Sequence, residues 1–301
     1  MYPESVESIR AESLSEAARL LREHGPRARL LAGGQSLIPL LKFRLAVPDV
    51  LVDISHLSPD ESVRFEDDSV HLHALTTHRE AGEHERLTET FDVVGDAIPQ
   101  LADPQVRNMG TVGGSLAEAD PAGDWGPLVL VADGVVHVAN ADGERTTPAS
   151  EFFVGPFETA LEPDEVVTGV SLDRPTAAKS GGAYLKVKRR QGVYAVAGVG
   201  VRVGLNEGDE CVSISVACNA VEPTYATPDV TDVFLGERID DESVTAGADR
   251  IESELDPVAD THGSADYKRN LCTRLFERAA RAARDRALGH AVDPDPMGVA
   301  P

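Results

Sequence analysis

The hydrophobic and polar positions near the start of the chain predict a small α/β unit. Apolar residues recur at helical spacing from Leu14 to Leu21 in "SLSEAARLLREHGP", where a serine caps the helix and the Gly-Pro pair stops it. The stretch "ARLLAGG" predicts a short buried strand, "LIPLLKFR" a helix starting near Pro39, and "VLVDI" a second strand. We therefore expect residues 1–55 to form a first subdomain.

Alternating positions in residues 62–84, "SVRFEDDSVHLHALTTH" and its surroundings, predict strands joined by a turn at "EDD". The pattern then becomes helical in "RLTETFDVVGDAIPQLAD", with a break expected at Pro99. A β-hairpin is predicted around the turn "NADG". Residues 56–175 are expected to form a second subdomain, and "LDRPTAAKSGG", residues 172–182, is the best linker candidate.

The last third of the chain predicts a separate layered unit. The stretch "AYLKVKRRQGVYAVAGVGVRVGLNEGDECVSISVACNAV" has the pattern of three strands, with "NEGDE" as a hairpin-like turn. The segment that follows is helical, and Leu271, Leu275 and Ala279 lie on one stripe. We expect residues 180–290 to form a third, C-terminal domain.

Charge narrows the range of partners. The 301 residues include 51 Asp and Glu against 28 Lys and Arg, a net charge of −23, which argues against nucleic acid and anionic membranes. No apolar run approaches the roughly 18 residues of a membrane span, and the acidic N-terminal segment does not resemble a signal peptide. We therefore expect a soluble, cytoplasmic protein. The acidic surface also suggests a halophilic host, because hydrated carboxylates repel neighbouring molecules where salt screens other charges.

Metal-site and catalytic patterns are not evident. Cys211, Cys218 and Cys272 lack the spacing of zinc or iron–sulfur sites, so we expect them to be buried and reduced, and no metal is predicted. His71 and His73 share one face of a predicted strand, which we interpret as a solvated edge rather than a ligand pair. No Ser-His-Asp, Cys-His or paired-carboxylate arrangement stands out, and no catalytic residue is predicted.

Two glycine loops carry the candidate chemistry. The loop "AGGQS" at residues 32–36 fits neither the dinucleotide-binding nor the P-loop spacing, and alone it would be an ordinary turn. The second loop, in "RNMGTVGGSLAEADPAGDW", changes this interpretation, since two converging glycine loops can hold a pyrophosphate with backbone N–H groups and no basic side chain. Residues 32–36 and 111–115 would supply the amides, with the hydroxyls of Ser36, Thr111 and Ser115.

Asp124 ends the second glycine-rich stretch and has two interpretations. Its carboxylate could accept hydrogen bonds from ribityl or ribose hydroxyls, or it could cap a helix beginning at Trp125.

These two loops resemble the signature loops of the FAD-binding medium subunits of molybdenum hydroxylases, and they are most similar to those of aerobic carbon monoxide dehydrogenase medium subunits. The stretches "EFFVGPFETALEPDEVV", "YLKVKRRQGVYAVAGVGVRV" and "ADTHGSADYKRNLCTRLFERA" extend the resemblance over nearly the whole chain. It implies an α+β fold, in which a two-subdomain FAD-binding region of the vanillyl-alcohol-oxidase type precedes a smaller α+β flavoprotein C-terminal domain.

The resemblance also implies where FAD would bind. The cofactor would lie between the two subdomains, with its pyrophosphate on the first loop and its isoalloxazine near the second. The cofactor-binding residues carried over are Ala32, Gly33, Gly34, Gln35 and Ser36 on the first loop, Thr111, Val112, Gly113, Gly114 and Ser115 on the second, and Asp124, the Leu161 backbone and Lys186.

This chain departs from many relatives at two positions, with Ser115 in place of Asn and Val193 in place of an acidic residue. Tyr194 would either stack near the flavin or fill a strand face. The basic cluster of Lys186, Lys188, Arg189 and Arg190 would contact a phosphate or a partner subunit, or form a solvated strand edge.

The function implied is that of an electron-transfer subunit. Its FAD would accept electrons from the iron–sulfur centres of a small subunit and pass them to an external acceptor, either quinone or NAD. A molybdopterin large subunit would oxidise carbon monoxide within the hetero-oligomer. The alternatives are the same subunit in a complex that oxidises xanthine, an aldehyde or an aromatic acyl-thioester, and a non-catalytic nucleotide-binding or assembly protein that keeps the glycine loops as turns.

Overall fold

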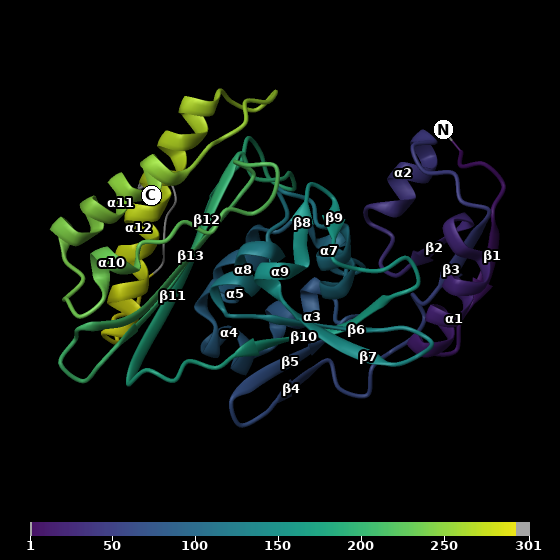
Figure 1. The fold of residues 1–301 in the computed structure, drawn as a ribbon, viewed down its shortest axis with the longest axis horizontal. Coiled ribbons are helices and arrows are strands. Elements are labelled where there is room, and N and C mark those ends of the chain that lie inside the picture. Colours follow the sequence, from purple (N-terminus) through teal and green to yellow (C-terminus); the bar gives the residue numbers. More distant parts are fainter. Residues whose placement is uncertain (1, 293–301) are drawn as a thin grey trace.

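The computed structural model describes residues 2–292 and has three main sheets side by side along its long axis (Figure 1). The first sheet is parallel, in the order β1-β3-β2, and contains β1 (Glu7–Arg10), β2 (Ala28–Leu31) and β3 (Val50–Asp53). The first helix is as expected: α1 (Leu14–His24) is capped by Ser13 and is followed by the 3-10 turn η1 (Gly25–Arg27). Helix α2 (Leu37–Phe43) starts before Pro39, whose place in the first turn costs no hydrogen bond.

The central sheet is antiparallel and has five strands. In spatial order they are β4 (Val63–Phe65), β5 (Ser69–His73), β10 (Val166–Asp173), β6 (Val135–Ala139) and β7 (Glu144–Pro148). The predicted hairpin is β6 and β7, and the side chain of Asn140 accepts from the amides of Asp142 and Gly143 in its turn.

Short helices pack on the face of this sheet that carries Val70 and Leu72. The helix predicted to break at Pro99 divides earlier, at Phe91, because this residue leaves the helical conformation and is buried in the core. The elements of this segment are α3 (His78–Glu83), α4 (Glu85–Thr90), α5 (Asp92–Ala97), η2 (Ile98–Gln100), α6 (Pro104–Arg107), α7 (Val112–Glu118), α8 (Trp125–Val131) and α9 (Ala149–Phe152), with a ribbon of β8 (Phe153–Gly155) and β9 (Glu158–Thr159).

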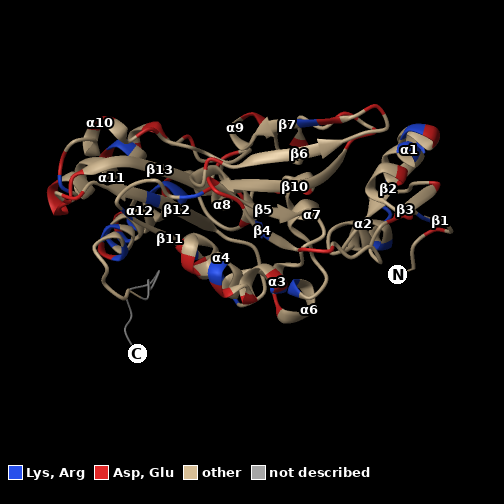
Figure 2. Ribbon diagram, turned by 90° about the horizontal axis from the view of Figure 1, so that it is seen from below, with Lys and Arg blue, Asp and Glu red and all other residues tan. Residues whose placement is uncertain are grey.

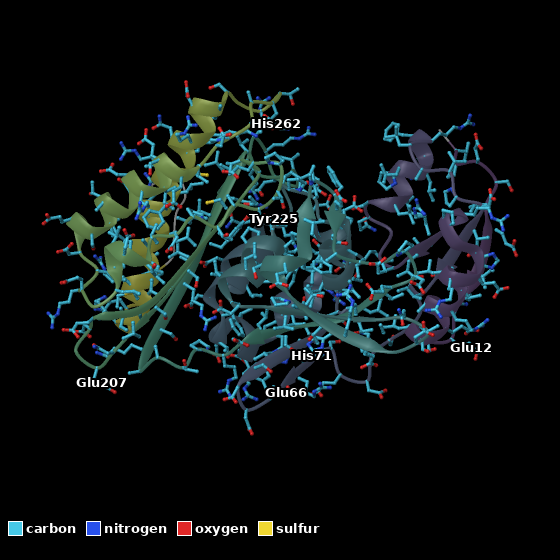
Figure 3. The ribbon with its side chains drawn as sticks, viewed as in Figure 1. Glu12, Glu66, His71, Glu207, Tyr225 and His262 are labelled. Carbon is cyan, nitrogen blue, oxygen red and sulfur yellow. The ribbon has the colours of Figure 1, made fainter. Side chains whose placement is uncertain are left out.

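The opposite face of the central sheet carries half-buried histidines, of which His71 is labelled in Figure 3. The interpretation of His71 and His73 as an edge pair is wrong, since β5 lies between β4 and β10. Ser171 on β10 is within hydrogen-bonding distance of His71 and of His137 on β6. Within residues 2–292, no group of three or more His, Cys, Asp and Glu could hold a metal ion.

The third sheet is antiparallel and is formed by β11 (Lys179–Val187), β12 (Ala197–Leu205) and β13 (Cys211–Asn219). Helix α12 (Ala265–Ala287) packs on it, together with α10 (Thr231–Phe234) and α11 (Asp241–Glu254). The predicted stripe on α12 faces this core, with Leu275 and Ala279 buried and Leu271 partly buried. The expected linker at 172–182 is mostly strand, and only residues 174–178 are irregular.

Carboxylates join the central and third sheets. The Asp92 carboxylate of α5 accepts from the Gly182 amide, and Asp96 accepts from the Tyr184 amide and from the Arg286 guanidinium. The edge of β11 that pairs with no other strand is thereby satisfied by side chains.

Three buried clusters form the hydrophobic cores, and Tyr184 and Ala217 of the third sheet belong to the central one. The boundaries 1–55, 56–175 and 180–290 stay a prediction. All three cysteines are buried and unpaired, as expected. No helix within the described chain is long and apolar enough to cross a membrane.

Candidate functional site

A cavity of about 870 Å³ lies where several segments of the chain meet. Its walls include the loop between β2 and α2, the stretch between Gly110 and Asp124, the segment from Leu161 to Val167, and residues 192–194, which connect β11 to β12. This volume lies within the range of pockets that hold small molecules and cofactors. Of the residues singled out in the sequence, those that line it are Ala32, Gly33, Gly34, Gln35, Ser36, Thr111, Gly113, Gly114, Ser115, Asp124, Leu161, Val193 and Tyr194.

The first loop presents unused backbone donors to this cavity. Strand β2 ends at Leu31 and α2 begins at Leu37, and Gly34 takes a left-handed conformation, with φ 70°, that lets the chain turn. Among the described residues, no acceptor receives a hydrogen bond from the amides of residues 32–37. Several free N–H groups in one turn before a helix are the type of backbone donor that binds anions.

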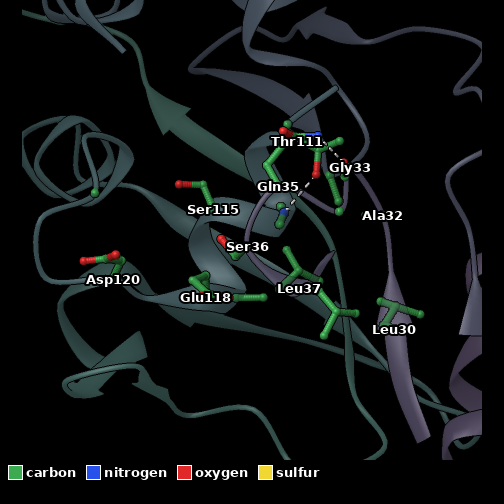
Figure 4. A pocket seen from close by; sticks show the side chains of 18 of the residues that line it. Leu30, Ala32, Gly33, Gln35, Ser36, Leu37, Thr111, Ser115, Glu118 and Asp120 are labelled. Carbon is green, nitrogen blue, oxygen red and sulfur yellow. Dashed lines mark hydrogen bonds between the residues drawn. The ribbon is translucent and has the colours of Figure 1, made fainter. Parts of the chain in front are cut away.

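Gly33 is required for a different reason from the one expected. A Cβ atom there would lie 2.1 Å from the carbonyl oxygen of Met109 and 2.8 Å from the Cα of Gly110. The missing side chain therefore lets the first loop pack directly on the backbone that leads into the second. The glycine holds the two loops together, which is how segments far apart in the sequence form one wall (Figure 4).

The second loop does not supply the amides expected of it. Thr111 caps α7, accepting from the Gly114 amide, while the amides of Val112 and Gly113 donate to the carbonyls of Thr76 and Ala74. The Ser115 amide donates within the helix to Thr111. The expectation that residues 111–115 form an anion nest is thus wrong for the amides of 112–115, because α7 and its contact with the preceding strand use them.

Side chains of the second loop have separate places. Val112 is fully buried and does not line the cavity. A Cβ on Gly113 would lie 2.5 Å from that of Ala74, so this glycine also serves close packing. Ser115 lines the cavity (Figure 4). The loop therefore contributes glycine backbone and the Ser115 side chain to the cavity wall.

Acidic and phenolic groups line another wall. Burial, and then the charge of Asp120, raises the pKa of Glu118, and burial raises the pKa of Asp120 itself. Desolvation and then Asp120 also raise the pKa of Tyr194. Tyr225, near the centre of the molecule in Figure 3, donates to the Asp120 carbonyl at 2.8 Å and fixes this segment.

Tyr194 lies outside the strands, in the connection between β11 and β12. Its side chain is 56% exposed and lines the cavity, so the interpretation of Tyr194 as a strand-face filler is wrong.

Asp124 and Lys186 form a buried ion pair behind the cavity. The Lys186 Nζ atom lies 2.7 Å from Oδ2 and 2.9 Å from Oδ1 of Asp124, and Tyr184 donates its hydroxyl to the same carboxylate at 2.6 Å. The side chain of Asp124 makes no capping bond, so the cap interpretation is wrong. Lys186 does not line the cavity, and its burial excludes a solvated strand edge at this position.

The remaining residues of the basic cluster serve other contacts. Lys188 donates to the Gln100 carbonyl, Arg189 donates to the carbonyls of Thr261 and His262, and Arg190 is exposed.

His78 is a cavity residue that the sequence interpretation missed. The Trp125 indole N–H donates to its Nδ1 atom at 3.0 Å, and burial lowers its pKa to about 4. A Cβ on Gly110 would lie 2.7 Å from its Nε2, so the imidazole packs on the second loop. The one available signal was the capping box from Thr77 to Glu80, which starts α3 at this histidine.

The fold and this cavity define a flavoprotein class, and comparisons with known proteins give its family. Residues 4–175 match the family model described as FAD binding domain in molybdopterin dehydrogenase, and residues 182–283 match the CO dehydrogenase flavoprotein C-terminal domain. The chain therefore belongs to the family of FAD-binding subunits of molybdenum hydroxylases. It is an FAD-dependent oxidoreductase subunit, and FAD is its cofactor.

Two sequence relatives and one solved structure illustrate what the chain is similar to. The chain is 34% identical to the carbon monoxide dehydrogenase medium chain of Hydrogenophaga pseudoflava, over 94% of this chain and 98% of that one. It is 35% identical to the glyceraldehyde dehydrogenase medium chain of Sulfolobus acidocaldarius, over 93% and 98%. A solved structure of carbon monoxide dehydrogenase from Hydrogenophaga pseudoflava matches with a TM-score of 0.90 at 34% identity, covering 95% of this chain and 99% of that chain. These matches confirm the α+β fold class and the resemblance.

Proposed function

We propose that the cavity holds FAD with its pyrophosphate against the first loop. The support is that the backbone amides of residues 32–37 donate no hydrogen bond to any described residue. They can therefore donate to phosphate oxygens without the help of a basic side chain. Gln35 contributes by donating its side-chain amide to the Gly33 carbonyl at 2.9 Å, which orients that carbonyl within the loop. The helix dipole of α2 adds a small favourable interaction with negative charge.

The isoalloxazine is proposed to lie beside the second loop, between Ser115 and Tyr194. Tyr194 offers an exposed aromatic face for stacking, and Leu161 supplies an apolar wall. The Asp124–Lys186 pair acts from behind this wall, where the carboxylate borders the cavity and the ammonium balances its charge. Val112 supports the loop from the core.

FAD supplies the redox chemistry, since its ring takes up and releases electrons. This chain binds the cofactor, orients it and excludes water from one side. We propose that the electrons come from iron–sulfur centres of a small partner subunit, that a molybdopterin large subunit oxidises the substrate, and that an external acceptor receives the electrons. Support for partners comes from the relatives, whose names describe medium chains.

Carbon monoxide is proposed as the substrate of the whole complex, because the sequence and structural matches include carbon monoxide dehydrogenases. The match to a glyceraldehyde dehydrogenase medium chain supports an aldehyde as the second candidate. To distinguish the two candidate substrates, carbon monoxide and glyceraldehyde are added separately to the purified complex, and bleaching of the flavin absorbance is measured for each.

A pair of substitutions at Ser36 tests the cofactor site. Ser36→Asp places a carboxylate at the start of α2, where it favours the helix but repels a pyrophosphate. We expect the dissociation constant for FAD, measured by calorimetry on the apo-protein, to rise at least tenfold. Ser36→Asn is the neutral control and is expected to change it less than about threefold.

Equal FAD affinity in both Ser36 variants and the wild type would place the pyrophosphate elsewhere. Thermal unfolding of the apo-proteins checks that neither variant has lost its fold.

A further inference from the structure

A second cavity adjoins the first. It has a volume of about 460 Å³ and shares the wall residues Ala102, Gly192 and Val193 with the proposed FAD cavity. Its other walls come from the segment from η2 to α6 and from the connection between β11 and β12. Tyr194, proposed to stack on the flavin ring, directly follows the shared residue Val193. A molecule in the second cavity would therefore lie next to the redox-active end of FAD.

The charge of this cavity is opposite to that of the molecule. Its lining includes two arginines, Arg107 and Arg190, in a chain with net charge −23. Positions of Asp and Glu, red in Figure 2, occur along all three parts of the ribbon. The one carboxylate lining the cavity, Asp103, accepts from the Val106 amide at 2.8 Å as the cap of α6. An anion in this cavity would thus meet two cations and a carboxylate that is already engaged.

Arg107 is held by contacts of its own side chain, whereas Arg190 follows a residue whose side chain is anchored. Arg107 donates one guanidinium nitrogen to the Leu101 carbonyl at 2.8 Å, and its Nη2 and Nε have no acceptor among the described residues. Arg189 anchors the other segment, because its guanidinium donates to the Thr261 carbonyl at 2.8 Å and the His262 carbonyl at 3.1 Å. This fixes the backbone next to Arg190, which makes no hydrogen bond or ion pair within residues 2–292.

We propose that the second cavity is an anion-binding subsite for the electron acceptor, recognising a carboxylate, phosphate or similar group with Arg107 and Arg190. This rests on the proposed function, since it assigns the acceptor class of that same flavin. Arginine suits the role because its planar fork binds two oxygens of one anion. Reduced FAD gives up two electrons and two protons when it is reoxidised. Two molecules of a one-electron anionic acceptor take up the electrons, and the two protons go to solvent. One molecule of a quinone takes up both electrons and both protons.

Binding is measured first, without turnover. Inorganic phosphate is added to the purified FAD-loaded complex at constant ionic strength, so that general screening does not change. We expect phosphate to raise the midpoint of thermal unfolding of the wild type and to have less than half that effect on Arg190→Gln and on Arg107→Lys. Arg19→Gln, on the exposed face of α1, removes the same charge far from the cavity and is expected to behave as the wild type.

Electron delivery is then measured in single turnovers. The FAD-loaded complex is reduced anaerobically with stoichiometric dithionite and mixed with ferricyanide, an anion, or with neutral benzoquinone. In Arg190→Gln we expect the ferricyanide concentration giving half-maximal reoxidation to rise roughly tenfold, with the benzoquinone value changed less than twofold.

The subsite would be overturned if Arg190→Gln changed the half-maximal concentrations of ferricyanide and benzoquinone equally, or if phosphate stabilised Arg190→Gln as much as Arg19→Gln. Either result would leave the proposed function intact. A wild-type complex whose flavin is neither reduced nor reoxidised would instead contradict the proposed function.

Discussion

His78 is the cavity residue whose protonation has the clearest consequence for stability. Burial lowers its pKa to about 4, from an ordinary value near 6.5. Between these two pH values His78 is protonated in the unfolded chain but neutral in the folded chain. The free energy of unfolding therefore falls as the pH decreases from about 6.5 to about 4. In this window, a plot of unfolding free energy against pH should be less steep for His78→Gln than for the wild type, by up to roughly 1.4 kcal/mol per pH unit.

Parallel curves for the two proteins would show that His78 ionises freely when folded. His71, whose pKa burial also lowers to about 4, is present in both proteins and cancels in the comparison.

At the same scale, the glycines show what a sequence can and cannot predict. The two loops were identifiable as a pair from their residues, and the structure brings them into one wall. The sequence does not say what approaches each glycine. At Gly33 and Gly113 it is backbone or side chain of this protein, 2.1 and 2.5 Å from the position of a Cβ. That information depends on long-range packing, which no local pattern contains.

At the scale of elements, the Asp124–Lys186 pair joins the start of α8 to strand β11. Both side chains are at most 5% exposed, so removal of one charge leaves the other buried without a partner. We expect Asp124→Asn to lower the free energy of unfolding by about 3 kcal/mol or more, measured with denaturant. The double variant Asp124→Asn with Lys186→Met should recover at least half of that loss, because it removes both charges.

Additive losses in the double variant would mean that the pair stabilises through packing rather than through charge balance. Glu23→Gln, which breaks an exposed pair with Arg19, is the matched surface control and should have little effect.

Element types were largely predictable from the sequence because periodicity and capping are local. Helix α1, the β6–β7 hairpin and the three strands from β11 to β13 follow from their patterns. The role of Lys186 did not, since its partner lies 62 positions away. From its sequence alone, a strand of mixed polar and apolar residues is interpreted as a solvated edge strand. Whether it is buried depends on tertiary packing.

At the scale of the whole molecule, the net charge of −23 sets the conditions for any assay. Adaptation to a salt-rich, cytoplasmic environment stays a prediction. Its physical basis is that self-repulsion between carboxylates weakens as salt screens them. The cavity lined by Arg107 and Arg190 departs from this acidic character.

The central claim is that this chain relays electrons through FAD from an iron–sulfur partner. It is tested most directly by mixing the FAD-loaded chain, without oxygen, with the separately purified and pre-reduced iron–sulfur subunit. We predict that the chain carries one FAD, that the oxidised flavin absorbance bleaches on mixing, and that it returns when an acceptor is added. A chain that binds no FAD, or a flavin that stays oxidised beside the reduced partner, would contradict the account.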